Sequence, residues 1–220
     1  MLPLTEETPK VLLGVAGRPF LAHLLKRLEL SGFSDVLLLT GHLGDAVDSY
    51  LAANPPAIRV ATLRDGDALL GTAGALKRAE ERLAETFVVT YGDSYLSFDY
   101  AAPLAMLESD VSALGCMAVF RNADRFEPSN ARVADGRVTA YDKSRPKGES
   151  FDCIDYGATA LRKEVVRGLP ADVALDLAPI LQVLAAKGEL LAYVARERFY
   201  EIGSPAGLAA LEAHLKGSQA

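Results

Sequence analysis

The chain has 220 residues, of which 50% are hydrophobic and 24% charged, and its formal net charge is −6 at pH 7. This length and composition predict a globular protein with a sizeable core and exclude a disordered chain. The acidic balance and the lack of a Lys/Arg block argue against a nucleic-acid partner. No apolar stretch approaches the ~20 residues that cross a bilayer, and no signal peptide is visible, so we expect a cytoplasmic protein without a membrane partner.

The cysteines and histidines do not form a recognisable reactive or metal-binding pattern. Cys116 and Cys153 lie in apolar, strand-like runs, which predicts two buried, reduced thiols. Their spacing matches no metal site. His23, His42 and His214 match no catalytic arrangement, so we expect them to be structural.

The first half of the chain alternates between helical and strand patterns. Apolar spacing predicts helices over 19–30, 44–51 and 73–83, and strands over 36–39, 58–63 and 87–90. The strands are continuous apolar runs, as expected when both faces of a parallel sheet are covered. This rhythm predicts a doubly wound, mainly parallel, Rossmann-like sheet with right-handed crossovers.

The second half adds a different pattern. We predict strands over 112–120, 131–133, 137–141, 153–161 and 190–194, and helices over 175–187 and 204–215. Asp135-Gly136 is a hairpin turn signal. The predicted fold class is therefore α/β, with antiparallel additions to the sheet, three layers (α/β/α) and a single domain over residues 1–220.

Two segments carry possible chemistry. Asp93 follows a predicted buried strand and a glycine, where a carboxylate would project from the carboxyl end of the sheet. In Gly71-Thr72-Ala73-Gly74, Thr72 can cap the following helix and Gly74 would let a flat ligand approach the backbone. Taken alone, Asp93 could equally cap a turn, and the glycine-containing loop could be a simple helix start.

Four segments in chain order resemble the sugar-1-phosphate nucleotidyltransferases. They are Pro3-Leu4-Thr5-Glu6-Glu7-Thr8-Pro9-Lys10, Gly71-Thr72-Ala73-Gly74-Ala75-Leu76, Tyr91-Gly92-Asp93 and Tyr200-Glu201-Ile202-Gly203-Ser204-Pro205. The resemblance implies that a nucleotidyl group passes from an NTP to a sugar 1-phosphate. The Gly-Thr-Ala-Gly-Ala-Leu form is similar to mannose- and heptose-1-phosphate guanylyltransferases, which favours GTP. A homo-oligomer is possible.

The resemblance also implies roles for individual residues. Asp93 and Glu201 would hold Mg²⁺, with Glu standing where the family has Asp, and Lys10 would contact the phosphates at the reaction centre. The loop residues Gly71, Thr72 and Gly74 would contact the nucleobase and ribose. Lys143 would hold the sugar phosphate, and the sugar pocket would include Asn130, Asp142, Asp155 and Gly157. The segment after Asp142-Lys143 departs from the family pattern, because its proline comes late, at Pro146.

The family normally opens with a hydrophobic strand and a Gly-Gly-x-Gly-(Thr/Ser)-Arg loop directly before the segment that starts this chain. Without them we expect weak NTP binding and unpaired strand edges. A start assigned at an internal methionine or a truncated paralogue would explain this. The alternative functions are a non-catalytic nucleotide-sugar-binding protein and a nucleotide-sugar-dependent glycosyltransferase. The latter would need an Asp-x-Asp motif, and Gly92-Asp93-Ser94 is not one.

Overall fold

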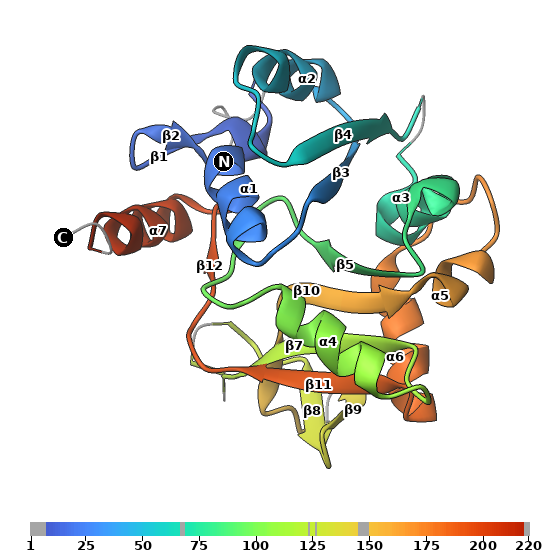
Figure 1. The fold of residues 1–220 in the computed structure, drawn as a ribbon. Coiled ribbons are helices and arrows are strands. Elements are labelled where there is room, and N and C mark those ends of the chain that lie inside the picture. The colour runs from blue at the N-terminus through green and yellow to red at the C-terminus, as the bar shows by residue number, and fades with distance from the viewer. Residues whose placement is uncertain (1–7, 67–68, 123, 126, 145–149, 218–220) are drawn as a thin grey trace. The chain divides into compact units, whose positions relative to one another are not determined.

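The computed structural model describes residues 8–66, 69–122, 124–125, 127–144 and 150–217 (Figure 1). The chain divides into two compact units. Unit 1 comprises Met1–Asp67, Tyr91–Asp99 and Phe199–Ala220, and unit 2 comprises Ala68–Thr90 and Tyr100–Arg198. Residues 1–7 of the first motif and Pro146 lie outside the described residues.

The described part of unit 1 contains short strands, three α-helices and a 3-10 helix. In chain order its elements are η1 (Lys10–Leu12), β1 (Gly14–Val15), β2 (Arg18–Pro19), α1 (Phe20–Leu30), β3 (Asp35–Thr40), α2 (Gly44–Ala53), β4 (Arg59–Arg64), β6 (Ser94–Tyr95), β12 (Tyr200–Glu201) and α7 (Pro205–Gly217). The helices predicted over 19–30, 44–51 and 204–215 are confirmed, and so are the strands over 36–39 and 58–63.

Helix α1 shows how the apolar spacing becomes packing. Its buried residues are Phe20, Leu21, Leu24, Leu25 and Leu28, which lie on one face at helical spacing. Leu21 and Leu25 pack with Val47 of α2. The helix ends before Gly32, whose φ of 84° is a left-handed conformation that glycine adopts without strain.

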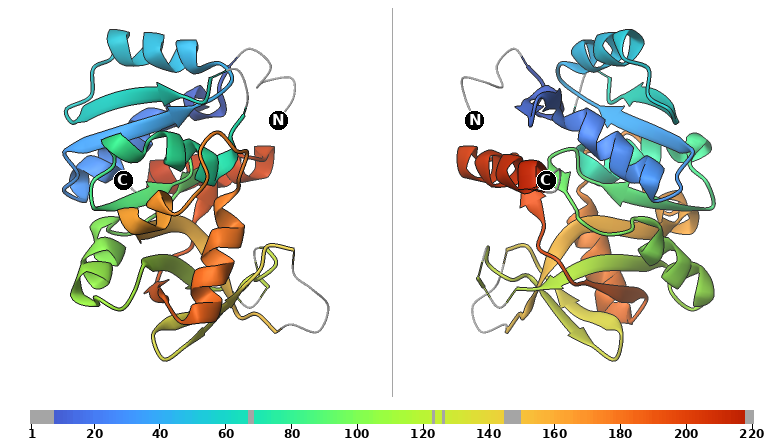
Figure 2. Two further views of the ribbon diagram at one scale, coloured as in Figure 1. Left: turned by 90° about the vertical axis from the view of Figure 1, so that its right-hand side faces the viewer. Right: turned by 60° about the vertical axis from the view of Figure 1, so that its left-hand side comes forward.

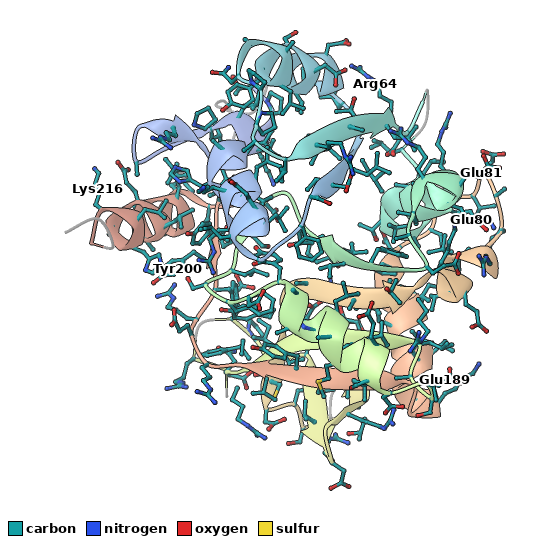
Figure 3. All side chains as sticks on the ribbon, viewed as in Figure 1. Arg64, Glu80, Glu81, Glu189, Tyr200 and Lys216 are labelled. Carbon is teal, nitrogen blue, oxygen red and sulfur yellow. The ribbon has the colours of Figure 1, made fainter. Side chains whose placement is uncertain are left out.

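Strands β3 and β4 pair in parallel, from Asp35 opposite Arg59 to Thr40 opposite Arg64. Residues 36–40 are only partly buried, so the prediction that both faces of β3 are covered is wrong within the described residues. In the part of the chain that the structure describes, β3 pairs only with β4. The further strand expected from the sequence stays a prediction. Arg64, labelled in Figure 3, ties the end of β4 to α2 through Asp45 at 2.7 Å and through Asp48.

Unit 2 contains a six-stranded sheet and four helices among its described residues. In chain order the elements are α3 (Gly71–Arg78), η2 (Glu80–Arg82), β5 (Thr86–Thr90), α4 (Ala101–Ser109), β7 (Gly115–Arg121), β8 (Ala131–Ala134), β9 (Arg137–Tyr141), β10 (Cys153–Arg162), α5 (Lys163–Arg167), α6 (Leu177–Lys187) and β11 (Leu190–Ala195). The sheet order is β5-β10-β7-β11-β9-β8. Helix α6 packs against β9 and β11, and the left view of Figure 2 shows it beside the β8–β9 hairpin.

The direction of the strands corrects the sequence prediction. Strand β10 runs antiparallel to both β5 and β7, and only β7 and β11 pair in parallel in this sheet. The mainly parallel sheet is therefore wrong for unit 2, although the α/β class and the antiparallel additions are confirmed. The reason is that β10 lies between two strands that precede it in the chain. A continuous apolar run does not reveal the direction of its neighbours.

Most other local predictions for unit 2 are confirmed. In the β8–β9 hairpin, Asp135 and Gly136 have φ values of 49° and 74°, as a type I′ turn requires. Helices α4 and α5 were not predicted, and the helix predicted over 73–83 ends earlier and is followed by η2. Cys116 and Cys153 are free and buried, and burial raises the pKa of Cys116 to about 12 and that of Cys153 to about 11. No described helix is long and apolar enough to cross a bilayer.

Candidate functional site

The short pairing of β6 with β12 brings two predicted metal ligands into one part of unit 1. Glu201 lies opposite Ser94, the residue after Asp93, in antiparallel register. The backbone N–H of Ile202 donates to the carbonyl of Asp93 at 2.9 Å. Asp93 itself lies in a turn in which Ser94 N donates to Tyr91 O at 3.4 Å, and Asp93 is partly exposed. The pairing thus holds two carboxylate-bearing segments side by side.

Lys10 belongs to the same unit. It is the first residue of η1, and its side chain is exposed. The next residue, Val11, lies against the turn that carries Asp93, because a Cβ atom placed on Gly92 would lie 3.1 Å from Val11 Cγ1. The structure therefore brings the segments of Lys10, Asp93 and Glu201 together within unit 1.

The carboxylate of Glu201 serves the start of helix α7. Its Oε2 accepts hydrogen bonds from the backbone N–H of Gly203 and, at 3.0 Å, of Ser204, while Oε1 accepts the Ser204 hydroxyl at 2.5 Å. Ser204 Oγ in turn accepts the N–H of Gly207 at 3.0 Å. The donors to Glu201 directly precede Pro205, the first residue of α7, so the carboxylate places a negative charge at the helix N-terminus, where it is favourable. The extra methylene of Glu lets the carboxylate reach them.

Aromatic side chains support this junction. Tyr200, labelled in Figure 3, stacks on His214 of α7 with ring centroids 4.4 Å apart. Tyr95 meets the same imidazole edge-on at 6.2 Å, and Ser97 Oγ lies 3.3 Å from His214 Nε2. His214 therefore packs β6, β12 and α7 together. His23 has a comparable role, since a ring nitrogen donates to the Val15 carbonyl at 2.9 Å.

Gly71-Thr72-Ala73-Gly74, predicted as a loop before a helix, forms the first turn of α3, so the helix begins two residues earlier than expected. A protein segment covers this turn. The carbonyl of Leu175 accepts hydrogen bonds from Ala73 N at 2.8 Å and Gly74 N at 3.1 Å. A Cβ atom on Gly74 would lie 2.6 Å from the Val173 carbonyl oxygen, and one on Gly71 would lie 2.7 Å from that of Leu175. Both glycines are thus required by segment 173–176. Any contact they make with a nucleotide would be additional.

Thr72 is the second residue of α3 and does not cap it. Helix α3 has no side-chain cap, and the Thr72 hydroxyl accepts the backbone N–H of Leu177, the first residue of α6, at 2.7 Å. The predicted capping role was therefore assigned to the wrong helix. The reason is that α3 already donates its first N–H groups to Leu175, while α6 begins next to Thr72.

A second polar cluster in unit 2 gathers most of the residues predicted to bind the sugar phosphate. Asn130 Oδ1 accepts the backbone N–H of Asp155 at 2.8 Å. The Asp155 carboxylate accepts the Tyr141 hydroxyl and the Gly157 N–H, both at 2.9 Å, and lies 4.0 Å from Lys143 Nζ. We call Asn130, Tyr141, Lys143, Asp155 and Gly157 the Asp155 cluster. The sequence singled out all of these except Tyr141, whose only signal is its place directly before Asp142-Lys143.

Asp142 shapes the turn beside this cluster. Its Oδ1 accepts the backbone N–H of Ser144 at 2.7 Å and the Ser144 hydroxyl at 2.6 Å. Its backbone N–H donates to the Asn130 carbonyl at 2.9 Å, and Gln182 of α6 approaches Oδ2 at 3.4 Å. The structure thus uses Asp142 to fix the chain on either side of Lys143. Its predicted contact with sugar hydroxyls stays a prediction.

Known proteins share this fold and sequence pattern. The family described as MobA-like NTP transferase domain matches residues 5–128, more than half of the chain. Glucose-1-phosphate cytidylyltransferase of Salmonella typhimurium is 26% identical over 86% of this chain and 82% of its own length. N-acetylmuramate alpha-1-phosphate uridylyltransferase of Neisseria meningitidis is 27% identical, with 83% and 78% covered. Mannose-1-phosphate guanylyltransferase of Mycobacterium tuberculosis is 26% identical, with 92% and 57% covered.

A solved structure extends the similarity to three dimensions. HddC of Yersinia pseudotuberculosis, complexed with GMP-PN, superposes with a TM-score of 0.78 at 23% identity and covers 98% of this chain and 93% of its own. At this identity the likeness supports the fold.

The packing of Gly74 generates a stability prediction. We expect Gly74→Ala to lower the free energy of unfolding by about 1–3 kcal/mol, because the new methyl group meets the Val173 carbonyl oxygen. That segment cannot easily move away, since Leu175 is joined to α3 by backbone hydrogen bonds. The cost of this contact should exceed the ~1 kcal/mol by which alanine is more favourable than glycine inside a helix. Gly217→Ala is the matched control, since nothing lies within 4 Å of a Cβ atom there. Urea unfolding measures both, and a Gly74→Ala variant as stable as the parent would contradict the packing argument.

The contacts of Glu201 generate a second prediction. Glu201→Gln should lower the free energy of unfolding by about 1 kcal/mol, because the charge at the start of α7 and one acceptor are lost. The loss should be the same with and without Mg²⁺. Glu212→Gln, on the same helix and paired with Lys216 at the surface, should change stability little. A loss that Glu201→Gln shows only in the presence of Mg²⁺ would instead assign Glu201 to the metal.

Proposed function

The chain belongs to the MobA-like NTP transferase domain family, and we propose that it transfers a nucleotidyl group from an NTP to a sugar 1-phosphate, releasing pyrophosphate. The curated relatives above carry out this kind of transfer with cytidylyl, uridylyl or guanylyl groups. One structural observation carries the proposal. The β6–β12 pairing holds Asp93 and Glu201 beside the segment of Lys10, as a phosphate-binding centre would need.

The reaction needs positioning and charge more than proton transfer. The second pKa of a phosphate monoester is near 6, so the attacking oxygen of the sugar phosphate is largely ionised at pH 7. The barrier lies in bringing two polyanions together in line. We assign Lys10 to the triphosphate and Lys143 to the sugar phosphate, where each exposed ammonium would offset the negative charge. Gly71, Thr72 and Gly74 would support the nucleoside, and Asn130, Asp142 and Gly157 the sugar.

We propose Mg²⁺ as the cofactor, held by Asp93 together with substrate phosphates. Bound there, the ion would neutralise charge on the phosphates that react. Asp93 fits this role, because its carboxylate is partly exposed in a turn at the β6–β12 pairing. Glu201 fits it less well, because both of its carboxylate oxygens accept hydrogen bonds at the start of α7. The second ligand position stays a sequence-based proposal.

Asp93 can be tested directly. Asp93→Asn should reduce Mg²⁺-dependent turnover by roughly 10³-fold or more, because several kcal/mol of charge stabilisation are lost. The fold should be unaffected, as circular dichroism and thermal unfolding would verify. Pyrophosphate release from an NTP and a panel of sugar 1-phosphates is the measurement. Turnover near that of the parent would remove Asp93 from the mechanism.

We propose a guanine nucleotide as the preferred donor. The Gly-Thr-Ala-Gly-Ala-Leu segment resembles guanylyltransferases, one relative is a mannose-1-phosphate guanylyltransferase, and one structural neighbour was solved with GMP-PN. The cytidylyl- and uridylyltransferases among the relatives make CTP and UTP the competing donors.

Donor choice is decided by comparing kcat/KM for GTP, CTP, UTP and dTTP with each sugar 1-phosphate. We expect GTP to exceed the others by at least about tenfold, which corresponds to ~1.4 kcal/mol of differential transition-state binding. Binding of nucleotide sugars without any pyrophosphate release would favour the non-catalytic alternative. Sugar transfer from a nucleotide sugar to an acceptor would favour the glycosyltransferase.

A further inference from the structure

We infer that Asp155 is a positioning residue that holds the Lys143 ammonium for the sugar phosphate; this inference rests on the proposed function. Lys143 lies shortly after the end of β9, and its side chain is 49% exposed. The side chain of Asp155, in contrast, is buried, with only 6% of it exposed. A long, flexible cation beside a fixed, buried carboxylate has its range of positions reduced.

The backbone of β10 explains why Asp155 is fixed. The pairing of β10 with β7 shifts register between Asp155 and Thr159, which is a bulge in the strand. Gly157 lies within the bulge with φ of 90°, and Thr90 Oγ1 donates to its carbonyl at 3.0 Å. The bulge aims the N–H of Gly157 at Asp155 Oδ1, so the carboxylate orientation is set by the sheet itself.

The neighbouring strands complete the arrangement. Tyr141, at the end of β9, donates its hydroxyl to Asp155 Oδ2, the same oxygen that faces Lys143. Asn130 accepts the N–H of Asp155 through its side chain and the N–H of Asp142 through its carbonyl. The two residues before Lys143 are thus connected to Asp155, Tyr141 directly and Asp142 through Asn130. This connection is more than a surface ion pair requires.

The chemistry follows from the charge balance. Before substrate binds, the Asp155 carboxylate offsets the Lys143 charge and orients the ammonium. When a phosphate monoester arrives, Lys143 can contact both anions, because an ammonium has three donors. The carboxylate would also disfavour phosphate bound without Lys143 between them. Asp155 would therefore act through Lys143 and would not need to touch the substrate.

The test is a double-mutant cycle with kinetic readouts. Asp155→Asn keeps the size and one acceptor oxygen but removes the charge. We expect it to raise the KM for the sugar 1-phosphate about tenfold, with the KM for NTP changed less than about twofold. In a Lys143→Gln background the same substitution should add no further rise, because its effect passes through Lys143. Asp152→Asn is the control, since Asp152 directly precedes β10 and pairs with Arg121 at 2.9 Å.

Several outcomes would overturn the inference. A rise that persists in the Lys143→Gln background would mean that Asp155 acts on the sugar directly. An equal rise in both KM values, with a lower unfolding temperature than the Asp152→Asn control, would reduce Asp155 to a structural role. An unchanged KM for sugar 1-phosphate would refute the inference outright.

A spectroscopic readout separates this inference from the proposed function. The order parameter of the Lys143 side chain, measured by NMR relaxation on the full chain without substrate, should fall in Asp155→Asn and not in Asp152→Asn. If the parent releases no pyrophosphate with any NTP and sugar 1-phosphate, the proposed function fails while this measurement still reports on the positioning of Lys143. An unchanged order parameter would contradict the inference whatever the activity.

Discussion

The antiparallel pairing of β6 with β12 is the contact on which the candidate centre depends. It joins two strands of two residues each, and the whole of segment 100–198 lies between them in the chain. Bringing such distant segments together costs loop-closure entropy, although that cost grows only slowly with length. Two strand residues cannot offset it by backbone hydrogen bonds alone. The stacking of Tyr200 on His214, with Tyr95 at its edge, supplies apolar contact at the same place.

The two glycines of the Gly71–Gly74 loop illustrate what sequence reasoning reaches and what it does not. The sequence predicted that a flat ligand approaches the backbone at Gly74, and in the structure a protein segment lies there. It could not identify the approaching group, because Val173 and Leu175 are distant in the chain and lie in a segment without a motif. A ligand and a protein segment impose the same requirement on a glycine. The structure assigns that requirement to segment 173–176, and the proposed nucleotide contact must fit alongside it.

The same holds for the elements of the fold: those set by neighbouring residues were predicted, and those set by distant partners were not. Elements with clear periodicity, such as α1 and the β8–β9 hairpin, are determined by neighbouring residues and were predicted well. The antiparallel position of β10 and its bulge depend on partners elsewhere in the chain. Helix α4 was missed although Leu104, Met106 and Leu107 pack on the sheet, since its pattern is short and lacks a capping residue. For the candidate site, motifs in the sequence identified most of the residues. Which of these residues lie together became known only from the strand pairings of the structure.

In an acidic protein that binds polyanions, carboxylates near the substrate would repel it unless groups of the protein hold them. Among the described residues, three such carboxylates accept hydrogen bonds within the protein. Glu201 is engaged by N–H groups at the start of α7, and Asp142 by Ser144 in its turn. Asp155 is engaged by Tyr141 and Gly157 next to Lys143. Each carboxylate thus has hydrogen-bond donors within the protein, which fix its orientation and localise its charge. Lys10, near the β6–β12 pairing, and Lys143, in the Asp155 cluster, are exposed. Each place therefore presents to solvent a cation that a phosphorylated substrate requires. The net charge of −6 therefore does not oppose phosphate binding at these places, because the sign of the local field is set by which charges the fold exposes.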